Sequence, residues 1–562
     1  MASVRGSQPR YGYSPPPELT DGTVRRVPIV IVGAGPVGLA AAAEFATLGH
    51  HTLLLDDADT VSAGSRAICW SKRTLEIFDR IGVGDRMVAK GVVWNRGRLF
   101  HREREVYNFD LLPESGHQRP AFINLQQYYV EEYLVERVLE LGRTEIRWLN
   151  RVTAVEVLSD GGARVTVETP DGVYRVDADY VLAADGVRST IRRSMGHDFK
   201  GKVFEDRFLI ADVVMKANFP SERWFWFEPP FHSGQSVLLH RQPDDVFRID
   251  FQLAPDADPE EERRPENVLR RLKQMLGPDV EFSLEWVSVY TFTCRRMERF
   301  RHGPVFFVGD SAHVVSPFGA RGGNGGIQDI DALCWKIALV LGDQAPLDLL
   351  DSYDDERIPA ADENIMNSAR STDFMTPKTP ASVDFREAAL EMATDLPFAR
   401  RLVNSGRLSV PHVYRETPLS MADRDVWSAG PVPGTPAPDA RVAADTDEPW
   451  LLRRLGGRFT LLRFVDTVPA DGGGGLVEGL RPAVDVLTVA RHGQPNRSTV
   501  VDTEGLAFQR WSASDGSAYL VRPDQHVAAR WQHPSAHDIS RALDRAVARS
   551  AAVGHRRVAV GG

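Results

Sequence analysis

Short apolar runs, glycine turns and amphipathic segments follow one another at the start of the chain. Residues 27–32 (Val-Pro-Ile-Val-Ile-Val) form a continuous apolar run, which is typical of a buried strand. A glycine turn and an Ala-rich segment that ends near Leu48-Gly49 come next, and residues 51–55 form a second apolar run. This order predicts a strand, a tight turn, a helix and a second strand, as in a parallel βαβ unit.

The pattern then predicts two helices and a hairpin. Ser71 is a suitable N-cap for an amphipathic helix, and residues 128–141 predict a second helix that stops at Gly142. Residues 151–157 and 163–168 alternate between apolar and polar side chains around a Ser-Asp-Gly-Gly turn. We expect these two segments to form an antiparallel hairpin.

The periodicity changes twice in the remainder of the chain. From about residue 200 to 300, long segments alternate with period two, which predicts one sheet with a covered face, inserted between parts of the first domain. The strand–helix pattern returns with a strand at 304–308 and a helix at 327–341. A Pro-rich stretch at 431–438 is a stiff linker by composition, and a third, smaller α/β domain follows it.

Composition and charge limit the possible functions. The net charge of −10 gives the chain no general attraction to nucleic acid or to anionic membranes. Its three cysteines are far apart and show neither a metal-binding nor a disulfide pattern. No stretch reaches the ~20 apolar residues that would span a membrane. Residues 1–26 lack the apolar core of a secretory signal and predict a disordered lead-in. We expect a soluble, cytoplasmic protein without a metal.

The first glycine turn carries the clearest chemistry. Gly33 permits the turn, Gly35 lets the backbone approach a pyrophosphate, and Gly38 allows close packing of helix and strand. The helix N-terminus would face the phosphates with free N–H groups. Asp56 follows Gly33 by 23 positions, close to where an acid meets a ribose hydroxyl. The pattern favours dinucleotide binding over the alternative, a βα turn that binds nothing.

Two later turns repeat the strand-then-loop arrangement. The Asp185-Gly186 pair follows a buried strand, and the Gly309-Asp310 pair follows another. The second pair leads into a loop with glycines at 319, 322, 323, 325 and 326, which implies backbone placed against a ligand. A simple turn is the alternative for the first pair, and a flexible surface loop is the alternative for the second.

Taken in order, the three turns resemble those of the group A flavoprotein monooxygenases, the FAD-dependent aromatic hydroxylases related to para-hydroxybenzoate and phenol hydroxylases. The resemblance covers roughly residues 27–360. The stretch around residues 519–531 is similar to the thioredoxin-like extension of phenol-hydroxylase-type members. No cysteine lies beyond Cys334, so that extension cannot perform thiol–disulfide chemistry, and a structural or oligomerisation role is left.

This resemblance implies an α/β fold with a Rossmann-like FAD-binding domain, an inserted, mainly antiparallel β-sheet substrate domain and a C-terminal thioredoxin-like α/β domain. The expected parts are a disordered N-terminal segment (1–26), the FAD-binding domain (27–200 and 295–400), the substrate domain (201–294), a linker (401–438) and the thioredoxin-like domain (439–562).

The resemblance also implies a set of cofactor contacts. Asp56 stands where the family usually has Glu, and Arg66, which on its own reads as a surface arginine, matches a cofactor-contacting position. Ala320-Arg321-Gly322-Gly323-Asn324 replaces the common Gly-Gln-Gly-Leu-Asn. The expected FAD-binding residues are Gly33, Gly35, Pro36, Val37, Gly38, Asp56, Asp57, Arg66, Gln127, Asp185, Asp310, Pro317, Gly322, Gly323 and Asn324.

The chemistry implied by the resemblance belongs mostly to the cofactor. NAD(P)H reduces FAD, O₂ adds to give a flavin hydroperoxide, and an electron-rich ring, a phenol, attacks its terminal oxygen. Because the chain lacks a second glycine-triplet unit, NAD(P)H is expected to dock transiently as a co-substrate. The expected partners are a small phenolic substrate and O₂, with assembly into a homodimer or a higher homo-oligomer.

Substrate contacts are less constrained, because phenol hydroxylases carry an Asp before the Arg-Thr-Leu-Glu helix and residues 65–72 contain no acid. His240 could be an ordinary sheet histidine, and the tryptophans could be plain packing. The candidates are His240, Arg241, Tyr290 and Pro317 for catalysis, and Trp224, Trp226 and Gln252 for substrate contact. Two other functions stay open: Baeyer–Villiger or epoxidation chemistry in a biosynthetic pathway, and a flavin-binding protein without turnover.

Overall fold

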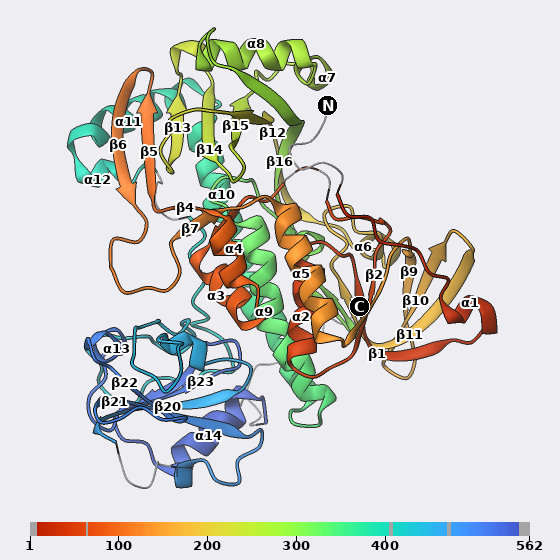
Figure 1. The fold of residues 1–562 in the computed structure, drawn as a ribbon, viewed down its shortest axis with the longest axis vertical. Helices are drawn as coiled ribbons and strands as arrows, with labels where there is room; N and C mark the ends of the chain where they lie inside the picture. Colours follow the sequence, from red (N-terminus) through yellow and green to blue (C-terminus); the bar gives the residue numbers. More distant parts are fainter. Residues whose placement is uncertain (1–7, 63, 65, 404–407, 469–473, 550–562) are drawn as a thin grey trace, which may run out of the picture. The chain divides into compact units, whose positions relative to one another are not determined.

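The computed structural model describes residues 8–62, 64, 66–403, 408–468 and 474–549 (Figure 1). Over these residues the chain forms two compact units. Unit 1 comprises Met1–Ser115, Arg119–Ile330 and Ala361–Val410, and unit 2 comprises Gly116–Gln118, Asp331–Ala360 and Pro411–Gly562. The C-terminal domain therefore groups with residues 331–360, which the sequence had placed in the FAD-binding domain.

A largely parallel sheet forms the base of unit 1. Its central strand is an apolar run buried from Ile29 to Val32, which is typical of a strand covered on both faces. The strand order is β17-β18-β11-β1-β2-β8, with β10 pairing β11 and β9 pairing β10 as the predicted hairpin. The strands are β1 (Arg25–Val32), β2 (Thr52–Leu55), β8 (Thr144–Arg147), β9 (Arg151–Val157), β10 (Ala163–Thr169), β11 (Gly172–Ala183), β17 (Arg301–His302) and β18 (Val305–Phe307).

The second sheet of unit 1 is mainly antiparallel, as expected, with one exception. Strand β5 pairs β13 in parallel, and the β5–β6 hairpin comes from residues 96–110, for which the sequence had predicted no strand. The order is β19 (His313–Val314), β16 (Phe282–Arg296), β12 (Lys200–Met215), β15 (Val246–Gln252), β14 (Ser236–Arg241), β13 (Arg223–Phe227), β5 (Arg96–His101) and β6 (Arg104–Asp110).

This sheet has two distinct faces, because successive side chains of a strand point to opposite sides. One face, which we call the outer face, packs Leu239, Ile249 and Phe251 against α8. Figure 1 shows α8 lying across this sheet. The other, which we call the inner face, carries Phe225 and Leu238 in a separate core that includes residues of α10 and α11.

Helices and a small third sheet complete unit 1. The sheet has the order β3 (Cys69–Ser71), β7 (Phe122–Asn124), β4 (Val92–Trp94). None of the described helices is long and apolar enough to cross a membrane. The α-helices wholly in unit 1 are α1 (Pro17–Asp21), α2 (Pro36–Thr47), α3 (Lys72–Arg80), α4 (Gly84–Lys90), α5 (Gln127–Leu141), α6 (Thr190–Ser194), α7 (Pro259–Glu262), α8 (Pro265–Leu276), α11 (Pro380–Asp395) and α12 (Pro397–Arg400), and the 3₁₀ helices are η1 (Pro230–His232) and η2 (Gly309–Ser311).

The predicted helix signals correspond to real helix ends. Ser71 is the N-cap of α3, and Gly142 ends α5 in the left-handed conformation, with φ of 64°. The helix predicted at 327–341 begins earlier: α9 (Gly322–Leu341) already includes the last glycines of the loop.

The N-terminal segment differs from the expectation. Residues 1–7 lie outside the described residues, but residues 8–26 contain α1 and the start of β1 and do not form a disordered lead-in. A buried ion pair joins Glu18 to Arg147 at 3.0 Å, and Tyr11 stacks on Trp148 with ring centroids 4.4 Å apart. These contacts fix a segment whose composition alone indicated disorder.

Unit 2 contains the C-terminal α/β domain that the sequence predicted. Strands β20–β22 pair in parallel, and β23 and β24 extend the sheet in the antiparallel sense. The order is β22 (Thr499–Val501), β21 (Val484–His492), β20 (Phe459–Thr467), β23 (Ala518–Val521) and β24 (Val527–Trp531). Its helices are α13 (Leu506–Trp511), α14 (Ala536–Ala546), η3 (Leu347–Asp351), η4 (Leu451–Arg454) and η5 (Gly474–Leu476), joined by the C-terminal part of α9 and the N-terminal part of α10 (Ser352–Met375).

A fully buried ion cluster lies within unit 2. Glu356 of α10 accepts from Lys336 of α9 at 2.7 Å and from Arg522 at 2.5 Å. Arg522 also pairs with Asp524, and all four side chains are 0% exposed. Burial opposes ionisation of Glu356, but Arg522 and Lys336 outweigh it and lower the pKa of this carboxyl to about 2. Buried ion pairs therefore join α9 and α10 to the C-terminal domain within unit 2.

We expect Glu356→Gln to destabilise unit 2 by about 3–5 kcal/mol, because it leaves the buried Lys336 without its acid and Arg522 with Asp524 alone. The folded pKa of about 2 lies below the ordinary value of 4.5, so the contribution of the carboxylate is complete above pH 4.5 and is lost as the pH falls towards 2. Urea unfolding at pH 7 and through this window measures both effects. The exposed Glu416→Gln is the control, and equal unfolding midpoints for the two variants would contradict the assignment.

Candidate cofactor and substrate site

The first glycine turn joins β1 to α2 and is shaped by close backbone contacts. Gly33 has φ of 105°, and a Cβ on it would lie 2.5 Å from the carbonyl oxygen of Ala184. A Cβ on Gly38 would lie 1.9 Å from the oxygen of Gly33. A Cβ on Gly35, the N-cap of α2, would meet nothing within 4 Å. Gly33 and Gly38 are therefore required for the close packing of the backbone. Gly35 leaves open space at the N-terminus of α2, where an anion is favoured.

Asp56 stands beside this turn at the end of β2. Its carboxylate accepts from the backbone N–H of Ala34 at 2.5 Å and of Ala58 at 2.8 Å. Burial raises the pKa of this carboxyl, and the exposed Asp57 raises it further. The structure thus shows Asp56 anchoring the turn, and its contact with a ribose stays a prediction.

The second turn adjoins the first. Ala184, whose oxygen restricts Gly33, is followed by Asp185, and Asp185 Oδ2 accepts from the N–H of Ile191 at the start of α6. Its other oxygen, Oδ1, is buried and has no hydrogen-bond partner among the described residues. Burial raises the pKa of Asp185. An orphaned buried acceptor of this kind is expected at a ligand site.

Hydrogen bonds tie the second turn to the third. Arg192 of α6 donates to the carbonyl oxygens of Ser311, at 2.8 Å, and of Val187, at 2.7 Å. Ser311 Oγ donates to the oxygen of Ala183 at 2.5 Å. The Asp185-Gly186 and Gly309-Asp310 pairs are thereby held in one place, although more than 120 residues separate them in sequence.

The third turn packs directly on the first helix. Gly309 has φ of 59° and donates its N–H to Asp329 of α9 at 2.9 Å. A Cβ on Gly326 would lie 2.6 Å from Val37 of α2 and 3.1 Å from the Cα of Gly309. The third turn and the first turn of α9 therefore pack on the Val37 side chain and on each other's backbone, which is the reason for glycines at these positions.

Asp310 faces solvent from within this convergence. Its side chain is exposed, yet the surrounding protein raises its pKa by desolvation, against the opposing effect of His313 and Arg66. An acid that is both exposed and surrounded by protein is in a concave place. It is available to accept hydrogen bonds from a polyhydroxyl chain.

Gln127 organises the loop that carries Arg66. Its Oε1 accepts from the N–H of Ala67 at 3.1 Å, and its Nε2 donates to Ser62 at 3.1 Å and to Glu131 at 2.8 Å. Arg66 itself is exposed and lowers the pKa of Asp310, so the two side chains are close enough to interact electrostatically. Gln127 thus acts on the loop, and Arg66 is the residue of the pair that is exposed for a ligand.

The glycine-dense loop is held by Asn324. Its Oδ1 accepts from Ser71 N at 2.9 Å, and its Nδ2 donates to the oxygens of Cys69 at 2.9 Å and Ala320 at 2.6 Å. Ala320 is in the left-handed region, with φ of 52°, where the resemblance expects Gly. Pro317 is exposed, and Gly322 and Gly323 form the first turn of α9.

These residues fit FAD. The open space at Gly35 and two helix N-termini suit a pyrophosphate, and the orphaned oxygen of Asp185 and the exposed Asp310 suit hydroxyl donors. The convergence places all three predicted turns together, as a single dinucleotide requires.

A cavity of about 70 Å³ lies on the inner face of the second sheet, beside the glycine-dense loop. Five aromatic side chains and two arginines make up most of its wall: Phe109, Phe225, Phe227, Phe318, Phe374, Arg98 and Arg223. Trp224 and Trp226 alternate with Phe225 and lie on the outer face, where they pack with the core under α8. Phe225 and Phe227, and not the two tryptophans, are therefore the β13 aromatic side chains that line the cavity.

The predicted catalytic residues fall on both faces. His240 is buried on the inner face, where burial, Arg223 and Arg248 lower its pKa well below the usual 6.5. Arg241, the next residue, lies on the outer face with its guanidinium 5.8 Å from the ring centroid of Phe247.

Two further predicted residues share the inner face. Gln252 accepts from the N–H of Ser236 at 3.0 Å and so closes the end of β14. Tyr290 pairs with Phe208 across β12 and β16 and is 38% exposed, yet desolvation by the surrounding protein, together with Asp310, raises its pKa to about 12. The Tyr290 hydroxyl is therefore protonated at neutral pH.

Sequence reasoning missed a group of charges on the inner face. Arg248 makes a bidentate ion pair with Asp212, both contacts at 2.8 Å, and Arg223 and Asp250 lie near it. The signal is present in Arg248-Ile249-Asp250-Phe251, where charged and apolar side chains alternate in a buried strand. Charges repeated on one face of a buried strand indicate a polar site.

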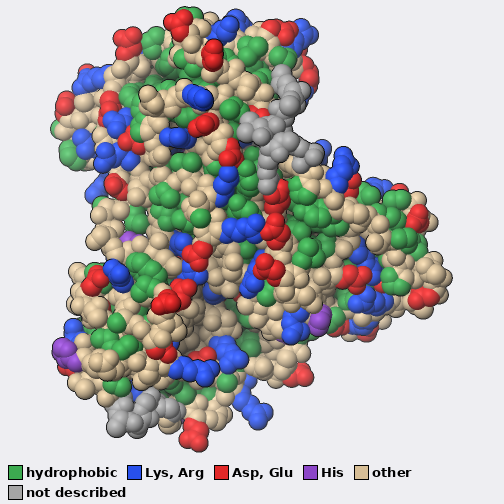
Figure 2. Space-filling model, viewed as in Figure 1, with side chains coloured by type: hydrophobic (Ala, Val, Ile, Leu, Met, Phe, Trp, Pro, Cys, Tyr) green, Lys and Arg blue, Asp and Glu red, His purple; other side chains and the backbone are tan. Residues whose placement is uncertain are grey.

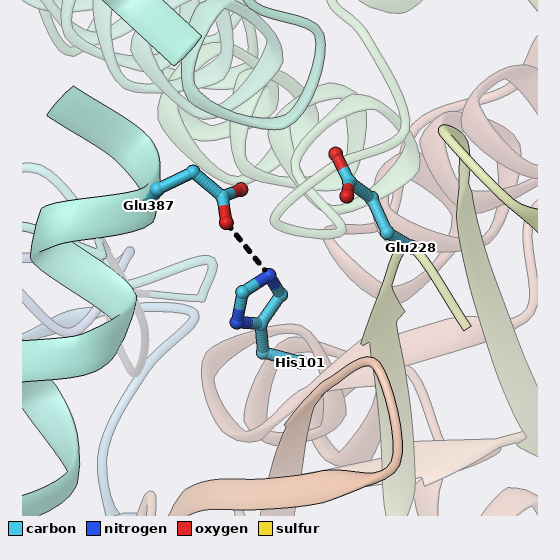
Figure 3. A group of neighbouring side chains, drawn as sticks. All are labelled: His101, Glu228 and Glu387. Atoms are coloured by element: carbon cyan, nitrogen blue, oxygen red, sulfur yellow. Dashed lines mark ion pairs between the residues drawn. The ribbon is translucent and has the colours of Figure 1, made fainter. Parts of the chain in front are cut away.

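His101, Glu228 and Glu387 form a second polar cluster, drawn in Figure 3. His101 ends β5, Glu228 follows β13 and Glu387 belongs to α11, and the His101 Nε2 lies 3.1 Å from Glu387. Arg386 contacts both carboxylates, and Arg102 lies 3.8 Å from Glu228 and 3.5 Å from Glu387. Because two guanidinium groups already neutralise the two acids, the cluster favours an ion-pair network over a metal site.

Comparison with known proteins agrees with this geometry. Residues 26–368 match the family described as FAD binding domain, and residues 430–550 match the one described as aromatic-ring hydroxylase, C-terminal. The chain is 30% identical to 12-dehydrotetracycline 5-monooxygenase/anhydrotetracycline 6-monooxygenase of Streptomyces rimosus subsp. rimosus, over 89% of this chain and 95% of that protein. It is also 30% identical to 6-methylpretetramide 4-monooxygenase of Streptomyces rimosus, over 90% of each. A solved ternary complex of aklavinone-11 hydroxylase with FAD and aklavinone has the same fold, with a TM-score of 0.75 at 24% identity, over 94% of this chain and all of that one.

We expect Gly35→Val to abolish FAD retention while leaving the fold intact, because its side chain would enter space that is open in the protein alone. Gly12→Val, at another position where a Cβ meets nothing within 4 Å, is the matched control and should purify with FAD. Flavin absorbance per protein and circular dichroism measure the two properties. A Gly35→Val protein that retains full FAD would contradict the placement of the pyrophosphate.

Proposed function

This chain belongs to the FAD-binding aromatic-ring hydroxylases, the group A flavin monooxygenases, and we propose that it uses NAD(P)H and O₂ to hydroxylate a phenolic ring of a polycyclic aromatic substrate. It is an FAD-dependent monooxygenase with the C-terminal domain that is thioredoxin-like in this family. The observation that carries the proposal is the convergence of the Gly33, Asp185 and Gly309 turns, next to an aromatic cavity on the inner face.

Bound FAD would supply the activation of O₂ with electrons from the nicotinamide. The chain supplies binding and orientation. The Gly35 turn and the N-terminus of α2 would take the pyrophosphate, and Asp310 would accept from the ribityl hydroxyls. The loop from Pro317 to Gly323 would border the flavin ring, and Phe318 at its centre also lines the cavity. A ring held by the cavity would thus lie beside the reactive end of the cofactor with water largely excluded.

The chain shows one dinucleotide fingerprint in its sequence, and FAD would fill it. We therefore infer that NAD(P)H docks transiently. Figure 2 shows Lys and Arg side chains interspersed with Asp and Glu over the face in view, which supports the expectation that nucleic acid is not a partner. Assembly into a homodimer or a higher homo-oligomer, and a location in the cytoplasm, stay predictions.

The substrate class rests on the relatives. Two proteins that are 30% identical over most of their length are named for monooxygenation of tetracycline-type or pretetramide compounds. The aromatic wall of the cavity suits a flat ring system. Its volume of about 70 Å³ is less than the ~150 Å³ of an engineered cavity that holds benzene. A ring can enter only with movement of the lining side chains, of which Phe374 and Met375 belong to the end of α10.

The alternative that uses the same cofactor is Baeyer–Villiger or epoxidation chemistry. Arg223, which lines the cavity, and Asp250, which interacts electrostatically with it, favour hydroxylation, because they suit an acidic hydroxyl on the ring that is attacked. Mass spectrometry of products formed under ¹⁸O₂ separates the two: hydroxylation places one labelled oxygen on the ring, whereas Baeyer–Villiger chemistry yields a lactone or ester.

We expect Asp310→Ala to purify with little FAD and to lose the NAD(P)H oxidation that a panel of polycyclic phenols stimulates in the wild-type protein. The Asp310 carboxylate is the exposed hydrogen-bond acceptor where the three turns meet. Without it, the ribityl hydroxyls of FAD lose that acceptor. The exposed Asp256→Ala is the matched control. A fully yellow Asp310→Ala protein would refute the cofactor assignment, and wild-type oxidation that no phenol accelerates would refute the proposed reaction.

A further inference from the structure

Arg223 on β13 is a half-buried cation that the described protein leaves without a partner. It lines the cavity next to Phe225, and the structure shows no hydrogen bond of its side chain and no carboxylate within 4.0 Å among the described residues. Burial lowers the pKa of its guanidinium. Arg248, by contrast, has Asp212 as a bidentate partner. A guanidinium that the protein partly desolvates and does not pair gains when a ligand supplies an acceptor, so such a ligand is expected.

Asp250 on β15 is the corresponding unsatisfied anion. Its Oδ1 is buried and has no hydrogen-bond partner in the described part of the chain. The pairing of β13, β14 and β15 puts Arg223 beside His240, and His240 beside Arg248, on the inner face. Asp250 is two residues beyond Arg248 on that same face. Arg223 and Asp250 influence each other electrostatically but do not touch.

The missing group must satisfy both residues at once. Arg223 can only donate hydrogen bonds, and an ionised Asp250 can only accept them. A carboxylate would suit Arg223 but would be repelled by Asp250, and an ammonium group would have the opposite difficulty. A hydroxyl can accept from Arg223 and donate to Asp250. An acidic hydroxyl can also transfer its proton to the carboxylate and remain as an oxyanion beside the guanidinium.

We propose that Arg223 and Asp250 together bind the acidic hydroxyl of the substrate, with Asp250 accepting its proton and Arg223 holding the resulting phenolate or enolate. In this step the substrate O–H bond breaks and an O–H bond forms on Asp250, so charge and atoms balance within the site. The proton leaves Asp250 for solvent when the product departs. The inference rests on the proposed function and deepens it, because it excludes a carboxylate as the recognised group.

The neighbouring groups allow a defined pH response. Burial raises the pKa of Asp250 to about 6, Arg248 and Arg223 oppose this rise, and Asp212 adds to it. His240 has its pKa lowered well below 6.5, and the pKa of Cys69 is raised to about 11 by burial. With a pKa of about 6, Asp250 changes charge between pH 5 and 7.

The test compares two probes of one shape on the FAD-loaded protein, 4-nitrophenol and 4-nitrobenzoate, with binding followed by perturbation of the flavin absorbance. At pH 7 the wild-type protein should bind the phenol about tenfold more tightly than the carboxylate. Asp250→Asn should bind the carboxylate about tenfold better than wild type does, because the repulsion is gone. Arg223→Gln should weaken both probes. The exposed Asp256→Asn and Arg104→Gln are matched controls for fold and flavin content.

The pH dependence provides a second readout. As the pH falls through about 6, Asp250 becomes neutral, so wild-type affinity for 4-nitrobenzoate should rise, whereas the affinity of Asp250→Asn should stay flat. A wild-type protein that binds both probes equally or binds neither, or an Asp250→Asn variant with unchanged preference, overturns the inference. These measurements need no turnover, so their outcome is separate from that of the product analysis that tests hydroxylation.

Discussion

The structure of unit 1 depends on the direct backbone approach of three chain segments that are far apart in sequence. A methyl group on Gly33 would meet Ala184, and one on Gly326 would meet both Val37 and the backbone of Gly309. These contacts bring β1, β11 and the loop after β18 together at the carboxyl edge of the parallel sheet, where ligands bind in such folds. The cofactor site therefore depends on close packing that only glycine permits at these positions.

The inner face of the second sheet follows a different principle. There, apolar and charged side chains are mixed, with Phe225 and Leu238 next to Arg223 and Asp250. The bidentate Asp212–Arg248 pair shows that this environment can neutralise a buried charge fully when its geometry requires it. Arg223, which lines the cavity, and Asp250 Oδ1 make no hydrogen bond among the described residues, so a substrate that satisfies both gains an interaction the protein alone lacks.

Local signals in the sequence predicted much of the fold, since Ser71 and Gly142 stand at the ends of the helices they indicate. The sequence did not predict the parallel pairing of β5 with β13, because more than 120 residues separate the two strands and no local pattern records the pairing. The roles of Asn324 and Gln127 were also hidden, since an amide side chain that holds a neighbouring loop is indistinguishable in sequence from one that binds a ligand. The alternation of side chains along a strand predicts that Trp224 and Phe225 lie on opposite faces of the sheet. It does not predict which of the two faces carries the cavity.

The course of α9 has a consequence for protein engineering. Its first residues, from Gly322, belong to the cofactor site of unit 1, and its later residues contribute Lys336 to the buried charges of unit 2. A fragment cut at the Pro-rich segment would carry Arg522 and Asp524 away from Glu356 and expose a charged interior. Chimaeras that exchange C-terminal domains between relatives should therefore cross over within the helices, with residues 331–360 travelling with the domain they neutralise.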